Sequence, residues 1–483
     1  MVNHSALYRP ITETFGVDQL HQQDTIGILP DDVLLKVFRF FIGTANFNGS
    51  PSEKWHTLVH VCRRWRDLAL SSPRHLDLQL LCRPPKRSVR ETLEIWPKLP
   101  IYIHDFHNLT GDATDNIAAA LRLNHRVSGI QLERISDRAW ETFGPLMQKQ
   151  FPSLTHLWLG PHLKDAIPRS FLDGSAPCLR ALVLIGVSFP ALPELLLSAT
   201  NLVRLWYDSI TGSGYISPQA MVAGLSTLTR LESLSLTFQP FQDLQDRTVR
   251  IPPPHTRTLL PALTILHFRG VPEYMEDLIA QFDTPSLESM EITLFHQEVL
   301  EVSELAKFVR RADRLSSADR AAVAYMSDRI SVRLAKKLMG VGAQTLELEL
   351  LCHKSQFRLS YLVQLCVSCL PNPSPFDCLL IQAQQSSWRD AIGDLGPQWL
   401  DLLCPFSNVK RLRLAKHVAY PVAQALGGLQ AERVLEVLPA LEIVFMSELE
   451  PFGPVKEAIS EFSDMRQLFG HPVYIHWKEA HRY

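Results

Sequence analysis

The stretch FPSLTHLWL, residues 151–159, contains the pattern that decides the fold of most of this chain. Leu154, Leu157 and Leu159 occupy relative positions 0, +3 and +5 within it. Residues two apart in a strand point to the same face, so Leu157 and Leu159 are predicted to face a core and Trp158 to face away from it. The stretch therefore predicts a short strand that is buried on one face.

The same spacing of apolar residues recurs along the chain at intervals of 31, 27, 25, 23, 29, 32, 24, 56, 33, 33 and 32 residues. Units of about 20 to 45 residues that each contribute one strand are typical of solenoid proteins. We therefore predict an α/β fold with an irregular leucine-rich-repeat-like solenoid. The template starts at Trp96, Val127, Leu154, Leu179, Leu202, Leu231, Leu263, Leu287, Ala343, Phe376, Val409 and Leu441.

The segments between the strands are predicted to be turns and short helices, such as LPELLLSA and SPQAMVAGLSTL. The interval of 56 residues departs from the period. Within it, the charged first part of residues 304–334 is predicted to be an exposed helix or loop, and Ile330, Val332 and Leu334 alternate as in a strand. The units lack the Asn that regular leucine-rich repeats place after the strand, so they must be irregular. Because Leu-x-x-Leu-x-Leu also occurs by chance, a leucine-rich helical protein or a generic α/β array is the alternative.

The position between the last two apolar residues of each unit is predicted to face the open side of the sheet. Trp158 and Trp206 are candidate anchors for a protein substrate, because tryptophan is enriched in interface hot spots. The alternative is that either ring belongs to the core. The open-side positions are Trp158, Val183, Trp206, Ser235, His267, Glu291, Arg413 and Phe445.

A separate helical region precedes the repeats. In LPDDVLLKVFRFF, residues 29–41, Pro30 fits the first helical position and two Asp residues follow it in the first turn. The apolar residues of this helix cover more than half of its circumference, which is wider than one core requires. They are Val33, Leu34, Val37, Phe38, Phe40 and Phe41.

A second helix is predicted in SPSEKWHTLVHVCRRWRDLALSS, residues 50–72, where Ser50 and Glu53 have the spacing of a capping box. Roughly 60 residues are too few for a robust independent core. Part of the apolar surface of this helical pair is therefore expected to be covered by another protein or by the adjoining domain. Residues 1–24 are predicted to form a flexible tail.

The segments LPDDVLLKVFRFF and LVHVCRRWRDLALSSP resemble an F-box, with Leu-Pro, two acidic residues and Val-Leu in the first helix and Val-Cys-x-x-Trp in the second. The connection, residues 43–54, is longer than is usual in that family. The remainder, including LCRPPKRSVRETLEIWPKLPIYI, SDRISVRL and LPALEIVF, is similar to fungal, mushroom-type F-box proteins with an irregular leucine-rich-repeat-like domain. After the tail predicted at 1–24, the resemblance implies an F-box at 25–80 and a substrate-binding domain at 81–483.

The family docks on the Skp adaptor, and through it on a cullin, in SCF-type ubiquitin ligases, while the repeat domain holds a protein substrate. The resemblance implies that this chain is a substrate receptor and not an enzyme; a non-catalytic scaffold outside a ubiquitin ligase is the alternative. For Phe40, Leu58, Leu68 and Ala69, a place in the core is the preferred interpretation. The implied adaptor contacts are Leu29, Pro30, Val33, Leu34, Val37, Phe38, Val61, Cys62 and Trp65.

Composition and motifs favour protein partners over other ligands. Lys and Arg number 48 against 50 Asp and Glu, a net charge of −2, so no strong field attracts nucleic acid or an anionic membrane. No phosphate-binding loop, His-Glu-x-x-His or Gly-x-Ser-x-Gly motif occurs, and no cofactor is expected. Cys366 and Cys369, with Cys352, His353 and Cys378, are interpreted as buried thiols, and zinc is the alternative.

The expected location is cytoplasmic or nuclear. The first residues lack the pattern of a secretory signal, and eight irregularly placed cysteines fit reduced thiols better than a disulfide framework. The most apolar stretch, residues 181–199, contains Pro190, Pro193 and Glu194. It is therefore predicted to form a strand, a turn and a short helix instead of a membrane span.

Overall fold

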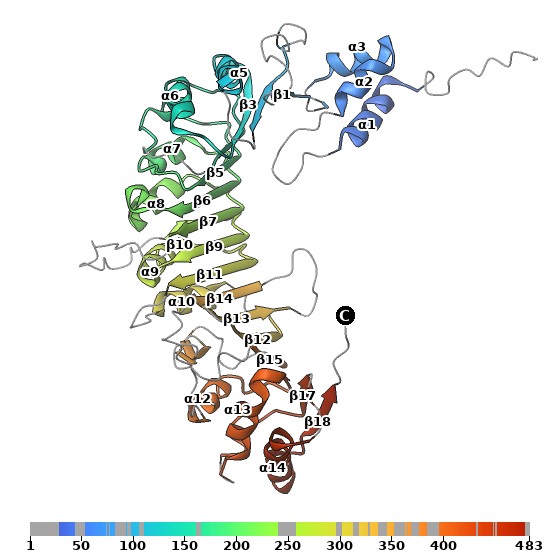
Figure 1. Ribbon diagram of the computed structural model, residues 1–483, viewed down its shortest axis with the longest axis vertical. Helices are drawn as coiled ribbons and strands as arrows, with labels where there is room; N and C mark the ends of the chain where they lie inside the picture. The colour runs from blue at the N-terminus through green and yellow to red at the C-terminus, as the bar shows by residue number, and fades with distance from the viewer. Residues whose placement is uncertain are drawn as a thin grey trace, which may run out of the picture. The chain divides into compact units, whose positions relative to one another are not determined.

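The computed structural model shows two compact units, Met1–Gln79 and Leu80–Tyr483, which we describe separately (Figure 1). The predicted tail of residues 1–24 lies outside the residues that the structure describes. The described residues are 29–43, 54–73, 75–76, 78–82, 93, 98–105, 111–160, 166–239, 257–295, 302–312, 318–326, 329–336, 345–351, 363–364, 366–368, 376–383, 396–430, 433–447, 449 and 452–478.

The first unit contains three described helices, α1 (Asp31–Ile42), α2 (Trp55–Val61) and α3 (Arg63–Ser71). Pro30 is the N-cap of α1, one residue earlier than predicted, and Asp31 and Asp32 lie in its first turn. The prediction of one second helix is wrong, because Cys62 is extended, with φ −154° and ψ 170°. Its thiol accepts a hydrogen bond from the backbone N–H of Trp65 at 3.5 Å and caps α3. The predicted capping box at Ser50 and Glu53 lies outside the described residues.

The core of the helical unit is small. Leu34, Phe38 and Ile42 lie four residues apart on α1 and are buried. The Phe38 ring packs against Trp65, with 4.8 Å between the ring centroids. The other helices contribute Trp55, Leu58, Val59 and Ala69 to the buried set.

The second unit is built on a sheet of 16 strands with helices along one face (Figure 1). In sheet order the strands are β1 (Leu80–Cys82), β2 (Ile101–Asp105), β3 (Val127–Leu132), β4 (His156–Leu159), β5 (Ala181–Ile185), β6 (Arg204–Ile210), β7 (Ser233–Phe238), β9 (Ile265–Gly270), β11 (Ser289–Phe295), β14 (Thr345–Leu351), β13 (Arg329–Ala335), β12 (Arg320–Tyr325), β15 (Cys378–Ala383), β16 (Arg411–Ala415), β17 (Ile443–Ser447) and β18 (Tyr474–Lys478). A small parallel pair joins β8 (Thr258–Leu259) to β10 (Phe282–Asp283).

The helices of the second unit are short, as the spacing of the strands requires. The predicted helical segments form α7 and α8, and Ser217 caps α8 by accepting a hydrogen bond from the N–H of Ala220. The helices are α5 (Gly111–Leu121), α6 (Asp137–Leu146), α7 (Leu192–Ser198), α8 (Pro218–Leu225), α9 (Pro272–Ile279), α10 (Ser303–Arg311), α12 (Gly396–Leu403), α13 (Lys416–Gly427) and α14 (Pro454–Leu468).

The repeating template predicts the core correctly. Trp96 and Ala343 lie outside the described residues, and all other template residues are at most 3% exposed. The units stack in register, so that Leu157 pairs with Leu182 and Leu182 with Leu205 on consecutive parallel strands. The fold is therefore an α/β leucine-rich-repeat-like solenoid whose core forms between the sheet and the helices.

The interval of 56 residues contains β12 and β13, which form an antiparallel meander with β14, the strand of the next unit. Strand β13 is the strand predicted from Ile330, Val332 and Leu334. The meander enters the sheet in reverse order, because β14 pairs with β11 and β12 pairs with β15. The preceding charged segment forms α10, which was expected to be exposed. Its apolar side is buried, so the expectation is correct only for its polar side.

Two buried charged side chains connect distant parts of the second unit. The carboxylate of Glu276 in α9 accepts hydrogen bonds from the backbone N–H groups of Glu304 and Leu305, each at 2.8 Å, at the start of α10. The guanidinium of Arg466 in α14 is 1% exposed, and burial lowers its pKa. It donates to the backbone carbonyls of Val434, Leu438, Pro439 and Leu441.

The apolar stretch at 181–199 forms β5, a turn and α7, as predicted. Among the described residues, the longest apolar helices are all too short or too polar to cross a bilayer.

Candidate protein-interaction surfaces

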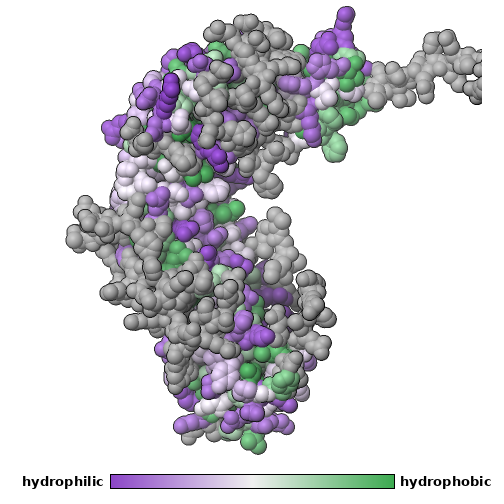
Figure 2. All heavy atoms as spheres, in the orientation of Figure 1, coloured by the Kyte–Doolittle hydropathy of each residue, from purple (hydrophilic) through white to green (hydrophobic). Residues whose placement is uncertain are grey.

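Helix α1 exposes large apolar side chains beside its buried side. Val37 is 47% exposed, Phe40 90% and Phe41 45%. Val61, at the end of α2, is 59% exposed. Hydrophobic colour is visible on the surface of the helical unit over α1 (Figure 2). We call the three side chains on α1, Val37, Phe40 and Phe41, the α1 apolar face.

Leu34 and Phe38 do not belong to that face, because both are 0% exposed. Their assignment as adaptor contacts is corrected: with Ile42 they recur every four residues and point into the unit's own core. The prediction for Phe40 is also wrong: a core position was expected, but its side chain is exposed. Leu58 and Ala69 are buried as predicted, and Leu68 is half-buried.

The remaining predicted adaptor contacts lie at or near the surface of the helical unit. Leu29, Val33 and Trp65 are half-buried, and Pro30 and Cys62 are exposed. The start of α1 is connected to α3, because Arg64 donates to the Leu29 carbonyl at 2.6 Å and forms an ion pair with Asp31 at 2.7 Å. Such an exposed pair contributes little stability, but it orients the Leu-Pro segment relative to α3.

In the second unit, the predicted open-side positions form continuous rows on the face opposite the buried leucines. The first row runs from Trp158 through Val183, Trp206, Ser235 and His267 to Glu291. The second row joins Leu380 of β15, Arg413 of β16, Phe445 of β17 and His476 of β18. All eight predicted positions therefore lie on one face of the sheet.

The two tryptophans lie on the same face with Val183 between them. Strands two apart are separated by about 9.6 Å, so both rings could contact one extended segment of a partner. Trp206 is 44% exposed, and Trp158 is half-buried with its indole N–H shielded from solvent. Trp206 is therefore the better anchor of the two, and Trp158 also contributes to packing.

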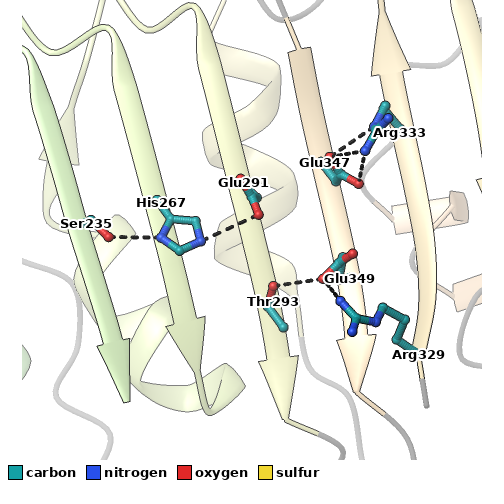
Figure 3. Close-up of polar contacts among 8 residues, drawn as sticks. All are labelled: Ser235, His267, Glu291, Thr293, Arg329, Arg333, Glu347 and Glu349. Atoms are coloured by element: carbon teal, nitrogen blue, oxygen red, sulfur yellow. Dashed lines mark hydrogen bonds and ion pairs between the residues drawn. The ribbon is translucent and has the colours of Figure 1, made fainter. Parts of the chain in front are cut away.

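A polar ladder lies next to the tryptophans, across β7, β9 and β11 (Figure 3). The Ser235 hydroxyl lies 2.9 Å from Nδ1 of His267, and Nε2 of His267 lies 3.5 Å from Oε1 of Glu291. The hydrogen bond from His267 holds the pKa of Glu291 below its ordinary value, against the opposing effect of burial, and the positive charge of Arg333 contributes to the shift.

The ladder continues onto the antiparallel meander (Figure 3). Arg333 on β13 donates to both carboxylate oxygens of Glu347 on β14, at 2.6 and 2.7 Å, which raises the pKa of Arg333. Glu349 accepts from the Thr293 hydroxyl at 3.2 Å and lies 3.6 Å from Arg329. These contacts join β11 to β14 and β14 to β13, where the strand direction reverses.

Ser235, His267 and Glu291 are connected in the order of a nucleophile, a base and an orienting carboxylate. Catalysis by such a triad requires N–H donors for an oxyanion close to the nucleophile. Strand β7 is paired with β6 on one side and β9 on the other, so its backbone N–H groups are used within the sheet. This geometry favours a structural or binding role for the three residues.

The predicted cysteine cluster is described only in part. Cys366 and Cys378 are buried, in agreement with structural thiols, and Cys352, His353 and Cys369 lie outside the described residues. Over the part of the chain that the structure describes, no three His, Cys, Asp or Glu side chains form a group that could hold a metal ion.

Comparisons with known proteins assign no family to this chain. No protein-family profile matches the sequence. A search of curated proteins finds no match either. Among solved structures, a leucine-rich repeat-containing protein, LegL7 from Legionella pneumophila, is similar with 13% identity and a TM-score of 0.29. The alignment covers 80% of this chain and 97% of that protein.

Proposed function

We propose that this protein is the substrate-recognition subunit of an SCF-type, cullin-based ubiquitin ligase. The helical unit would dock on a Skp adaptor, and the solenoid would hold a protein target. The observation that carries the proposal is the α1 apolar face, which a helix serving only its own core would not need. The F-box-like sequence of α1–α3 supports the identity of the partner.

The energetics of docking are favourable without charge complementarity. Burying about 500 Å² of apolar surface would contribute about 12 kcal/mol before the costs of association are subtracted. The protein would then act by proximity, because a target held beside a ubiquitin-conjugating enzyme reacts at a high local concentration. We place this function in the cytoplasm or the nucleus.

A non-catalytic scaffold is the second candidate, because the α1 apolar face would fit another helical partner equally well. The two candidates differ in whether a cullin is recruited. Purified full-length protein, mixed with a Skp adaptor and then with a cullin, distinguishes them: the ligase proposal requires a ternary complex, and a scaffold would bind neither protein.

The adaptor interaction is tested by the double substitution Val37→Asp and Phe41→Asp. We expect it to weaken adaptor binding by about 100-fold or more, because two desolvated apolar anchors are replaced by charges. Both side chains are already about half exposed, so the thermal unfolding temperature should change little. Binding is measured by calorimetry with purified adaptor.

The matched control is Arg39→Asp, which places the same charge on an exposed position of α1 that lies on a different side of the helix from Val37 and Phe41. It should leave adaptor binding within about twofold of wild type, as surface substitutions usually do. Unchanged binding by the double variant, or equal losses in both variants, would contradict docking through the α1 apolar face.

Trp206→Ala is expected to reduce the recovery of the target proteins without destabilising the solenoid. Hot-spot tryptophans typically contribute about 2 kcal/mol or more, which corresponds to at least about a 20-fold loss of affinity. The measurement compares ubiquitinated proteins in cells that express either variant, together with thermal unfolding of the purified proteins. Tyr420→Ala removes a 39%-exposed aromatic ring from α13 and serves as the control. A large fall in unfolding temperature for Trp206→Ala would instead place this ring in the core.

A further inference from the structure

The C-terminal end of the solenoid carries a stack of three side chains on the face opposite the helices. The Phe445 ring of β17 stacks on His476 of β18, with 5.4 Å between the ring centroids and 21° between their planes. On the side of β16, the guanidinium carbon of Arg413 lies 5.2 Å from the centroid of the same ring. Residues 413, 445 and 476 are aligned across the sheet by the parallel register.

Arg413 is exposed and keeps its hydrogen-bonding groups available. A guanidinium that stacks on an aromatic ring uses its face, so the N–H groups at its edge can still bind a carboxylate in bidentate fashion. Neighbouring cations are already paired: Arg411 with Asp377, and Lys410 with Glu442 at 3.4 Å. Among the described residues, Arg413 forms no ion pair with a carboxylate, and its guanidinium lies over the Phe445 ring.

The positive charge of Arg413 is not neutralised by a described carboxylate. Strands β15 to β18 contain no Asp or Glu, and Asp377 and Glu442, which directly precede β15 and β17, pair with Arg411 and Lys410. The polar ladder around Glu291 differs, since its cations and carboxylates neutralise each other. An anionic partner would therefore find charge complementarity at the C-terminal strands.

We propose that the Arg413–Phe445–His476 stack binds an acidic peptide segment of the protein target, with a carboxylate of the target on Arg413. This proposal rests on the proposed function, and it specifies which class of target the solenoid would hold. Exposed Tyr474, 66% accessible on β18, and half-buried Ile443 on β17 flank the stack and would contact apolar side chains beside the acidic one.

An acidic peptide fits this surface better than single-stranded nucleic acid. Proteins that bind single strands offer free aromatic faces on which bases stack. Arg413 approaches Phe445 from the strand on one side and His476 from the strand on the other, so both faces of this ring are occupied. Carboxylate binding needs only the edge of the guanidinium, which remains accessible.

The test uses the full-length protein and a fluorescein-labelled peptide of alternating Glu and Ser, with a Gln–Ser peptide and oligo-dT as comparison probes. Binding is measured by fluorescence anisotropy at low and high salt. We expect the Glu–Ser peptide to bind best and its affinity to fall as salt rises. Arg413→Gln should weaken it about tenfold or more, since hydrogen bonds to charged groups are lost.

Two further variants separate the stack from simple charge. Arg413→Lys keeps the charge but loses the planar fork, and Phe445→Leu keeps apolar area but loses the stacking surface; each should weaken binding severalfold. Lys456→Gln removes an exposed cation from α14 and should leave binding unchanged. Equal binding of the Glu and Gln peptides, preference for oligo-dT, or unchanged binding by Arg413→Gln would overturn the proposal.

Adaptor binding measured on the same preparations separates this inference from the proposed function. The Arg413 variants should bind the Skp adaptor as wild type does, and the Val37→Asp, Phe41→Asp variant should still bind the Glu–Ser peptide. If the wild-type protein bound the adaptor but not the Glu–Ser peptide, the result would contradict the role of the stack alone. If the wild-type protein did not bind the adaptor, the result would contradict the ligase proposal.

Discussion

Replacing Arg466 by alanine is expected to lower the free energy of unfolding of the C-terminal end of the solenoid by about 3–5 kcal/mol. The guanidinium lies over the Phe462 ring at 5.9 Å and donates to four backbone carbonyls between residues 434 and 441. Alanine would leave these buried acceptors without a donor and would open a cavity beneath α14. Leu438, one of the four acceptors, has a left-handed backbone conformation with φ of 51°.

Arg466→Met separates hydrogen bonding from packing, because methionine fills much of the same space without donors. It should lose somewhat less stability than alanine. Thermal unfolding and amide exchange of residues 434–441 measure the effect, and Lys456→Gln on the exposed side of α14 is the control. If Arg466→Ala lost less than about 1 kcal/mol, water would be replacing the guanidinium, and its structural role would be minor.

Glu276→Ala is expected to cost about 2–4 kcal/mol, because two backbone N–H groups in the first turn of α10 would lose their acceptor. Val302, the N-cap of α10, provides no side-chain hydrogen bond, so Glu276 replaces the missing local cap from another helix. Its carboxylate also complements the positive end of the helix dipole.

The amide variant Glu276→Gln keeps the size of the side chain but loses its charge and one acceptor oxygen. We expect an intermediate loss of stability, and Glu273→Gln, a half-buried carboxyl in the same helix, is the comparison variant. Thermal unfolding with hydrogen exchange of α10 is the measurement. Equal stability of Glu276→Ala and wild type would show that α10 does not depend on this cap.

The strands and the core could be predicted because their signal is local. Leucines at relative positions 0, +3 and +5 indicate directly which side of a strand is buried. The burial of Leu182 or Leu234 can therefore be predicted without knowing which distant residues contact it. The position between them also indicates the open face, which is why Trp206 and Arg413 were placed correctly. The same pattern does not state whether a ring such as Trp158 is covered.

The errors arise where tertiary contacts decide. Helical spacing continues from Leu58 through Trp65, so nothing in the local pattern marks the break at Cys62. Phe40 and Phe41 are both large and apolar, and the local pattern does not show that both rings are exposed, at 90% and 45%. Glu276 and Arg466 look like ordinary charged helical residues, because their partners lie about 30 residues away in sequence.

The reversed meander gives the solenoid a seam that divides it into two parallel blocks. Strand β11 pairs with β14 and β15 pairs with β12, so the two blocks are joined within the sheet through the antiparallel pairs β14–β13 and β13–β12. Units could be gained or lost on either side of the seam while its pairing stays intact. Within the sheet, the meander therefore connects the block that carries Trp158 and Trp206 to the block that carries Arg413.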